Sequence, residues 1–342
     1  MIAFRLDANA SVATGHMYRC ISIARVLRKA GEECIFLLAQ DENTNLLEKE
    51  GFQYHILNIS WENWDEGVPV VKEWIAKNRP SCLVADSYKV TKNFFVRLIE
   101  EVPILYLDDL CNTVYPVTSV IHYSEWPEED TLCKLYEGTD VSTYAGMQYV
   151  PLREAFEREA LDERRYELMI TTGGSDTYHV TLKVLERLLS HPFWKAQQIC
   201  VVMGRMNTDA EEILGITERF ENITVLQNIS NMDEIMRNSK YAISACGTSV
   251  FELMASGVAF VCFGFSDDQV YFGERLEKFG NALWAGDARK DAQRVTDVLL
   301  EKLEELSSRS QEEIRRLTAG NRILMDGRGA SRIAEIIMRL SR

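Results

Sequence analysis

The sequence predicts an α/β protein with two Rossmann-like domains, and the pattern of apolar segments carries this prediction. Short apolar runs, typical of buried parallel strands, alternate with segments whose apolar residues recur at helical spacing. The alternation stops at a charged stretch and then begins again. The chain has 342 residues, enough for two domains of ordinary size, and 46% of them are hydrophobic. We therefore expect a first domain over residues 1–156, a second over 166–325, and a C-terminal segment, 326–342, whose amphipathic helix can pack back on the first domain.

In the first domain, apolar runs predict the strands and periodic segments predict the helices between them. The expected strands cover residues 1–4, 33–39, 53–57, 81–86 and 102–107, and the expected helices cover 16–27, 43–50, 65–77 and 91–101. Residues 115–137 are expected to be irregular, with 144–156 as the last piece of the domain.

The highly charged residues 157–165 form the expected linker, and the second domain repeats the pattern. Its expected strands cover 166–172, 198–203, 223–226, 241–244, 258–264 and 281–285, and its expected helices cover 180–189, 232–236, 250–256 and 270–279. Long helices follow to the C-terminus, interrupted at residues 326–329.

The composition argues against several classes of protein. A net charge of −14 disfavours a nucleic-acid-binding surface, which needs clustered Lys and Arg. The 8 cysteines stand singly and without zinc-site spacing, which predicts reduced thiols in a cytoplasmic protein. The sequence has no apolar run long enough to span a bilayer. Asp108 and Asp109 are adjacent on a strand end and point to opposite faces, which favours a turn or a site wall over a metal site.

The turn between the first strand and the first helix is rich in polar residues. It is flanked by Arg5, Asp7 and Arg19, and Gly15-His16 opens the helix. In an open α/β sheet, ligands bind beyond the carboxyl ends of the strands, where such a turn lies. Gly15 allows a close backbone approach, and His16 can exchange a proton near neutral pH. The alternative for His16 is a residue that only caps the helix.

Glycine turns also follow two strands of the second domain. None matches a Gly-Lys-Ser/Thr phosphate loop or a full dinucleotide fingerprint, so neither ATP nor NAD is favoured. Gly173, Gly174 and Ser175 can form a diphosphate cradle or a structural turn. Glu252 follows the Gly247 turn and can accept hydrogen bonds from a ribose, or serve as an acid favoured at a helix N-terminus.

Motifs in the same order along nearly the whole chain resemble those of the nucleotide-sugar hydrolases of pseudaminic acid biosynthesis. The first are Arg5-x-Asp7, Thr14-Gly15-His16-x-x-Arg19-Cys20, Asp86-Ser87-Tyr88, Asp108-Asp109 and Tyr149-x-Pro151-Leu152-Arg153-x-x-Phe156. The others are Gly173-Gly174-Ser175-Asp176, Gly247-Thr248-Ser249-x-Phe251-Glu252 and Asp326-Gly327-x-Gly329-x-x-Arg332-Ile333.

The resemblance implies a two-domain glycosyltransferase B fold, with two Rossmann-like domains facing a cleft. Members cleave UDP from UDP-2,4-diacetamido-2,4,6-trideoxy-β-L-altropyranose by water attack with inversion, without a metal or another cofactor. By resemblance His16 is catalytic, and the expected substrate-binding residues are Arg5, Asp7, Gly15, Arg19, Tyr88, Asp268 and Gln269. The expected nucleotide-binding residues are Gly173, Gly174, Ser175, Gly247, Thr248, Ser249 and Glu252.

One departure from the family concerns the pair Asp268-Gln269, which is usually Asn-Gln. A carboxylate accepts hydrogen bonds and does not donate them, so the amino-sugar substituents can differ. Two alternatives stay open: a glycosyltransferase of the same fold that uses a UDP-sugar donor, and an inactive protein that binds nucleotide sugars. The expected partners are a UDP-amino sugar and the product UDP.

Overall fold

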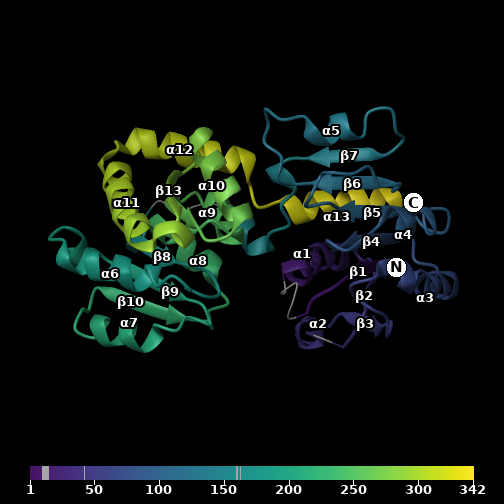
Figure 1. Ribbon diagram of the computed structural model, residues 1–342, viewed down its shortest axis with the longest axis horizontal. Helices are drawn as coiled ribbons and strands as arrows, with labels where there is room; N and C mark the ends of the chain where they lie inside the picture. Colours follow the sequence, from purple (N-terminus) through teal and green to yellow (C-terminus); the bar gives the residue numbers. More distant parts are fainter. Residues whose placement is uncertain (10–14, 42, 159–160, 162) are drawn as a thin grey trace. The chain divides into compact units, whose positions relative to one another are not determined.

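The computed structural model describes the chain apart from residues 10–14, 42, 159–160 and 162. It contains two compact units: unit 1 comprises residues 1–154 and 327–342, and unit 2 comprises residues 155–326. Each unit contains its own parallel sheet with helices packed on it (Figure 1). Thr14, at the start of the motif that contains His16, and residues 159, 160 and 162 of the expected linker lie outside the described part of the chain.

The sheet of unit 1 has the strand order β3-β2-β1-β4-β5-β6-β7, and each neighbouring pair is parallel. β1 lies inside the sheet, between β2 and β4, and all five of its residues are buried. This burial explains its continuous apolar character, since strands covered on both faces need no polar side. The strands are β1 (Ile2–Leu6), β2 (Cys34–Leu38), β3 (Gln53–Ile56), β4 (Cys82–Asp86), β5 (Ile104–Leu107), β6 (Ser119–His122) and β7 (Ser142–Ala145).

Alternate residues of the unit 1 strands belong to two separate hydrophobic cores, one on each face of the sheet. Phe4 and Val84 pack with α1, α2 and α13, whereas Ala3 and Leu83 pack with α3, α4 and α5. The helices are α1 (Gly15–Lys29), α2 (Thr44–Glu50), α3 (Trp64–Asn78), α4 (Lys92–Val96), α5 (Thr131–Leu135), α13 (Gly329–Leu340) and the 3₁₀ turn η1 (Met147–Tyr149).

The last helix of the chain, α13, belongs to unit 1 and packs on α1 (Figure 1). Its buried residues Ile333 and Ile337 join the core formed by β1 and α1. The helix begins so close to the preceding backbone that a Cβ on Gly329 would lie 2.1 Å from the carbonyl oxygen of Val150. Only glycine fits there, because real Cβ contacts are never that short.

The sheet of unit 2 has the order β10-β9-β8-β11-β12-β13 and is also parallel. Its strands are β8 (Tyr166–Thr171), β9 (Ile199–Met203), β10 (Ile223–Gln227), β11 (Ser239–Ala245), β12 (Ala259–Gly264) and β13 (Leu283–Asp287). Its helices are α6 (Val180–Ser190), α7 (Ala210–Thr217), α8 (Met232–Arg237), α9 (Thr248–Ala255), α10 (Asp267–Lys278), α11 (Ala288–Ser308) and α12 (Gln311–Leu324). It also contains the 3₁₀ turn η3 (Trp194–Ala196). Another 3₁₀ turn, η2 (Glu154–Glu157), lies where the chain passes from unit 1 into unit 2.

The structure confirms the predicted class, with two parallel-sheet α/β units. The expectation that residues 115–137 are irregular is wrong, because β6 and α5 lie within them and β7 follows. These elements are only four or five residues long, too short for a periodic apolar pattern to show.

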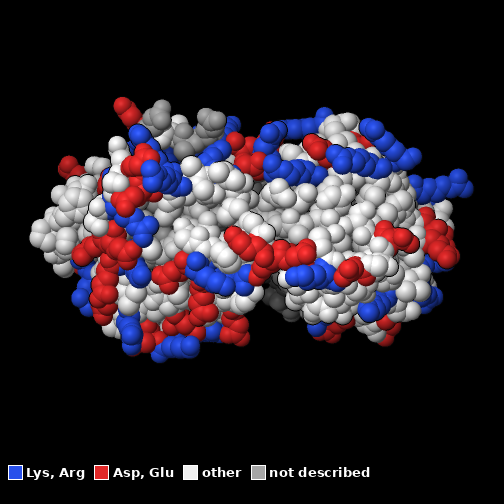
Figure 2. All heavy atoms as spheres, turned by 90° about the horizontal axis from the view of Figure 1, so that it is seen from above, with Lys and Arg blue, Asp and Glu red and all other residues white. Residues whose placement is uncertain are grey.

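The surface charges are mixed in sign. On the face shown in Figure 2, acidic and basic side chains lie interspersed over both units. Within the part of the chain that is described, no helix has both the length and the apolar character needed to cross a membrane.

Candidate functional site

His16 lies at the carboxyl edge of the unit 1 sheet, in the first turn of α1, and only 5% of its surface is exposed. Its Nδ1 atom lies 2.6 Å from Oδ1 of Asp86, the last residue of β4. The two meet because β1 and β4 are sheet neighbours, with Leu6 paired to Asp86, and α1 follows β1 directly. The topology therefore gives the histidine a buried carboxylate partner.

Arg19 stands one helical turn after His16 and binds the same carboxylate. Its Nε donates to Asp86 Oδ2 at 2.6 Å, and its two terminal nitrogens donate to Asp109 at 2.9 Å each. Of the remaining N–H groups of Arg19, one donates to Asp86 Oδ1 and one donates to the Tyr123 hydroxyl oxygen. A guanidinium has five N–H groups, so protein acceptors engage all of them. Arg19 therefore has no donor left for substrate, and we revise its predicted role from substrate contact to positioning.

The Asp86 carboxylate determines the proton arrangement on His16. Burial alone would raise the pKa of Asp86, but the charge of Arg19, followed by the interaction with His16, outweighs burial and holds that pKa well below its usual range. An ionised carboxylate only accepts hydrogen bonds, so Nδ1 of His16 must carry the proton and donate it. An Arg19 nitrogen also lies 2.9 Å from Nδ1, but its hydrogens are already directed to carboxylates. Nε2 is therefore left to accept a proton.

Tyr88 forms an aromatic wall beside His16. The two rings meet edge to face, with centroids 4.8 Å apart, and Tyr88 is 50% exposed. Partial burial, followed by the nearby charge of Asp109, raises the pKa of Tyr88, so its hydroxyl stays protonated at neutral pH. A half-exposed phenol next to the histidine can contact a ligand there.

The adjacent carboxylates after β5 have separate roles. Asp108 accepts hydrogen bonds from the backbone N–H groups of Leu110 and Cys111, at 2.9 and 3.1 Å, and so holds a turn. Asp109 binds Arg19. Tyr123, just after β6, completes this network and lies in the stretch expected to be irregular. Within the described residues, no group of His, Cys, Asp and Glu is arranged to hold a metal ion.

Arg5 and Asp7 form a buried pair at the end of β1. Arg5 is 0% exposed and donates to Asp7 Oδ1 at 2.6 Å. The indole nitrogen of Trp64 donates to Asp7 Oδ2 at 2.9 Å, and the Arg5 guanidinium lies 4.1 Å from the Trp64 ring. The full burial of Arg5 conflicts with its predicted contact with substrate. We revise its role to fixing the Asp7 carboxylate.

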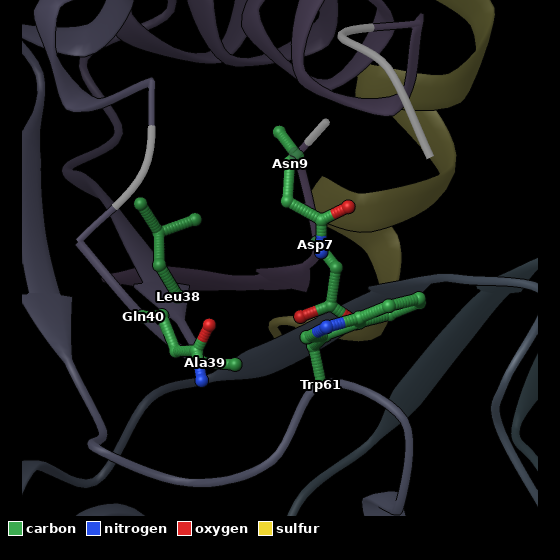
Figure 3. A pocket seen from close by; sticks show the side chains of 7 residues that line it. Asp7, Asn9, Leu38, Ala39, Gln40 and Trp61 are labelled. Carbon is green, nitrogen blue, oxygen red and sulfur yellow. The ribbon is translucent and has the colours of Figure 1, made fainter. Parts of the chain in front are cut away.

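A pocket lies next to this pair, at the ends of β1 and β2. Figure 3 shows Asp7, Asn9 and Trp61 on one side of it, with Leu38, Ala39 and Gln40 on the other. The predicted substrate residue Asp7 thus lines a pocket, whereas Gly15 is an exposed helix-starting residue.

In unit 2, the predicted diphosphate cradle is an exposed loop after β8. Gly173 has a φ of +84°, a conformation that favours glycine, and both Gly173 and Gly174 are exposed. A third glycine, Gly204, which the sequence analysis did not single out, packs against this loop. A Cβ on Gly204 would lie 2.2 and 2.3 Å from the carbonyl oxygens of Gly173 and Gly174. Met206 N–H also donates to Gly174 O at 3.0 Å.

The helix predicted to start at residue 180 follows this loop, as expected. Helix α6 begins at Val180, and Asp176 caps it by accepting hydrogen bonds from the backbone N–H groups of Val180 and Thr181, at 2.9 and 2.7 Å. A carboxylate from the chain itself therefore already occupies the positive end of α6. Any anion at this loop would bind to the glycine-loop amides and Ser175, not to the end of α6.

The second glycine loop leads into α9. Gly247 precedes the helix, Thr248 and Ser249 form its first turn without a side-chain cap, and Glu252 is half-buried on the same helix. The side-chain amide of Gln269 accepts a hydrogen bond from Phe265 N at 3.1 Å, and its Nε2 faces Gly247, 3.7 Å from where a Cβ would stand. The predicted residues 247, 248, 249 and 269 are therefore brought together.

Asp268 lies in the first turn of α10, beside Gln269, and is exposed. Its carboxylate is open to solvent at the position where the family pattern has an amide. The structure thus places Asp268 in the same helical turn as Gln269.

Comparisons with known proteins agree with this architecture. The structure resembles the crystal structure of MurG from Acinetobacter baumannii, with a TM-score of 0.69 and 13% identity over 99% of each chain. The fold is glycosyltransferase B. Residues 162–323, nearly all of unit 2, match the glycosyltransferase family 28 C-terminal domain.

Two curated relatives extend the comparison. The UDP-2,4-diacetamido-2,4,6-trideoxy-β-L-altropyranose hydrolase of Campylobacter jejuni is 22% identical over 276 residues, which cover 77% of this chain and 91% of that protein. The uncharacterized protein MJ1062 of Methanocaldococcus jannaschii is 26% identical over 277 residues. That match covers 76% of this chain, but the chain spans only about half of the relative, 54% of its length.

Proposed function

We propose that the protein hydrolyses a UDP-amino sugar, UDP-2,4-diacetamido-2,4,6-trideoxy-β-L-altropyranose or a close analogue, and releases UDP. The observation that carries the proposal is the pairing of His16 with the buried, ionised Asp86. The pairing prepares Nε2 of His16 to act as a general base. The substrate class comes from the name of the Campylobacter jejuni relative and from the motifs shared with its family.

In the proposed reaction, Nε2 of His16 takes a proton from water as the water oxygen attacks the anomeric carbon. The bond between that carbon and the diphosphate oxygen breaks, its electron pair leaves with UDP, and the sugar configuration inverts. Asp86 stabilises the imidazolium that forms. Amides of the Gly173–Gly174 loop and of the first turn of α9 stabilise the growing charge on the diphosphate. General-base assistance of this kind contributes about 10²- to 10⁴-fold.

A transferase is the second candidate, and the match of unit 2 to the glycosyltransferase family 28 C-terminal domain favours it. The same imidazole can take a proton from an acceptor hydroxyl group in place of water. The two reactions differ in what they require, since a hydrolase releases UDP with no acceptor present.

The test is to incubate the protein with UDP-2,4-diacetamido sugars and no acceptor, and to follow UDP and free sugar. We expect both products from the wild type. His16→Asn should reduce UDP release by at least about 10²-fold, because the base is lost, while UDP binding by calorimetry stays within about twofold. UDP release only after an acceptor is added would support the transferase, and undiminished turnover by His16→Asn would remove His16 from the mechanism.

A further inference from the structure

A second histidine–carboxylate pair lies in unit 2 and has no part in the reaction described above. Nδ1 of His179 lies 2.8 Å from each oxygen of the Asp209 carboxylate. The imidazole is half exposed, whereas only 10% of the Asp209 side chain is exposed. His179 directly precedes α6 and Asp209 directly precedes α7, so the pair joins the loop after β8 to the loop after β9.

The same two loops also contact each other at the glycines proposed to bind the diphosphate. Gly204, directly after β9, packs against the carbonyl groups of Gly173 and Gly174. The His179–Asp209 pair joins the other ends of the two loops. Because β8 and β9 are parallel neighbours, both loops lie at the carboxyl edge of the unit 2 sheet. The imidazole therefore belongs to the loop that carries the glycine amides.

The loop after β9 also holds a donor that lacks an acceptor. Oδ1 of Asn207 accepts a hydrogen bond from the Asp209 N–H at 2.8 Å, which fixes the amide beside the carboxylate residue. Nδ2 of Asn207 is buried and has no acceptor among the described residues. A buried donor without a partner is unfavourable, and an anion bound at these loops would supply the missing acceptor.

The charged groups around His179 favour a second proton on its ring. Asp209 faces the ring from the loop before α7, and Asp176 lies in the same loop as His179, where its carboxylate caps α6. The ammonium of Lys183, in the first turns of α6, donates to the carbonyl oxygen of Tyr178 at 2.8 Å. Within the described chain, the hydrogen bonds of the imidazole all involve Nδ1, so Nε2 is available to a ligand.

We propose that His179 takes up a proton when UDP binds and that the resulting imidazolium donates from Nε2 to the diphosphate. The Asp209 carboxylate only accepts, so Nδ1 carries the proton of the neutral ring and Nε2 is then an acceptor, as phosphate oxygens are. Two acceptors form no hydrogen bond, whereas a proton added to Nε2 creates a charge-assisted one. The proposal rests on the proposed function only for the place of the diphosphate at the Gly173–Gly174 loop.

The affinity for UDP then depends on pH in one direction. UDP prefers the protonated imidazole, so its affinity should rise as pH falls through the range near neutrality in which histidine gains a proton. The product UDP would accordingly leave more slowly at acidic pH.

Calorimetry of the full-length protein with UDP measures the proton directly. The binding enthalpy is determined at about pH 7 in buffers of different ionisation enthalpy, and its slope gives the protons taken up. We expect the wild type to take up more protons than His179→Asn, by at most one for each UDP bound. The affinity of this variant at about pH 6 should be about tenfold lower. Asparagine tolerates the positive φ of this position, +56°, so the backbone is retained.

His191→Asn is the matched control. His191 follows the last residue of α6, at the opposite end of the helix from His179, and its Nε2 lies 3.5 Å from Oε1 of Glu304. This variant should take up as many protons as the wild type. Asp209→Asn is a second test, because it keeps a polar side chain of the same size but removes the charge that favours the imidazolium, and it should also reduce proton uptake. Uridine has no phosphate and should cause no uptake.

The outcomes separate this proposal from the proposed hydrolysis. Proton uptake that is unchanged in His179→Asn and Asp209→Asn, or that is equal for UDP and uridine, overturns the role of His179 and does not affect the hydrolysis. A wild type that takes up a proton through His179 on binding UDP, but does not hydrolyse the diacetamido sugar, contradicts the proposed function alone. A wild type that does not bind UDP overturns the role of His179 as well.

Discussion

At the scale of single residues, Arg19 organises the histidine site although it does not face the proposed reaction. Its guanidinium joins Asp86 at the end of β4, Asp109 after β5 and Tyr123 after β6. Burial alone would lower the pKa of Arg19, but the charge of Asp86, followed by the interactions with Tyr123 and Asp109, raises it well above its usual value. The arginine therefore stays charged and keeps Asp86 ionised opposite His16.

Asp86→Asn tests this arrangement. An amide can donate to Nδ1, which would place the imidazole proton on Nε2 and remove the base, so we expect kcat to fall about 10²- to 10⁴-fold with a smaller change in KM. The control is Asp108→Asn, which alters a neighbouring buried carboxylate that contacts backbone amides and not His16. Similar kinetics for the two variants would show that Asp86 does not orient the histidine.

The pH dependence of stability gives a second measurement on Asp86. Its folded-state pKa is depressed, so its contribution to the free energy of unfolding is present above the unfolded-state pKa of about 3.9 and is lost as pH falls through the folded-state value. Denaturant titrations of the wild type and Asp86→Asn should therefore differ most near neutral pH and converge below about pH 4. A difference that stays constant down to pH 2 would contradict the depressed pKa.

Sequence reasoning found several residues of this site but not how they connect. Asp86 and Asp109 could be placed at strand ends, because each follows an apolar run. Tyr123 could not, since β6 is four residues long and carries little pattern. Nor does local sequence show that Arg19 turns inward to carboxylates, because its partners are 67 to 104 residues away along the chain.

At the scale of elements, the glycine loops of unit 2 depend on backbone contacts between neighbouring strands. The Gly173–Gly174 loop after β8 packs on Gly204, which follows β9, the adjacent strand of the sheet. The sequence predicts both strands and the first loop. It does not show that Gly204 touches that loop, because this contact arises only when β8 and β9 pair.

Gly204→Ala should therefore displace the loop without touching any ligand. A methyl group 2.2 Å from a carbonyl oxygen cannot be accommodated, so the Gly173–Gly174 backbone must move. If that loop binds the diphosphate, we expect calorimetry to show UDP binding weakened at least about tenfold, or about 1.4 kcal/mol. The control is Gly215→Ala in α7, where no described atom lies within 4 Å of the new Cβ, and where alanine favours the helix. Equal UDP affinity in both variants would place the nucleotide elsewhere.

At the scale of the whole molecule, one of the two units is not a continuous part of the chain. Unit 1 is built from both ends of the chain, because α13 returns to pack on α1 after unit 2 is complete. The amphipathic pattern of this helix predicts that it covers an apolar surface, but many surfaces meet that requirement. The close contact of Gly329 with Val150 fixes where the helix begins on unit 1.

Ile333→Ala tests whether α13 supports the histidine site. Ile333 is 0% exposed in the core shared with α1, so its truncation should lower the free energy of unfolding of unit 1 by about 2–5 kcal/mol. Hydrogen exchange should then quicken in β1 and α1, which carries His16, whereas unit 2, with a separate core, should keep its protection and its UDP affinity. Ile323→Ala is the control, because this isoleucine is 83% exposed and its loss should cost less than about 0.5 kcal/mol. Equal loss of protection in both units would mean that they unfold together, and the support from α13 would then not be local to α1.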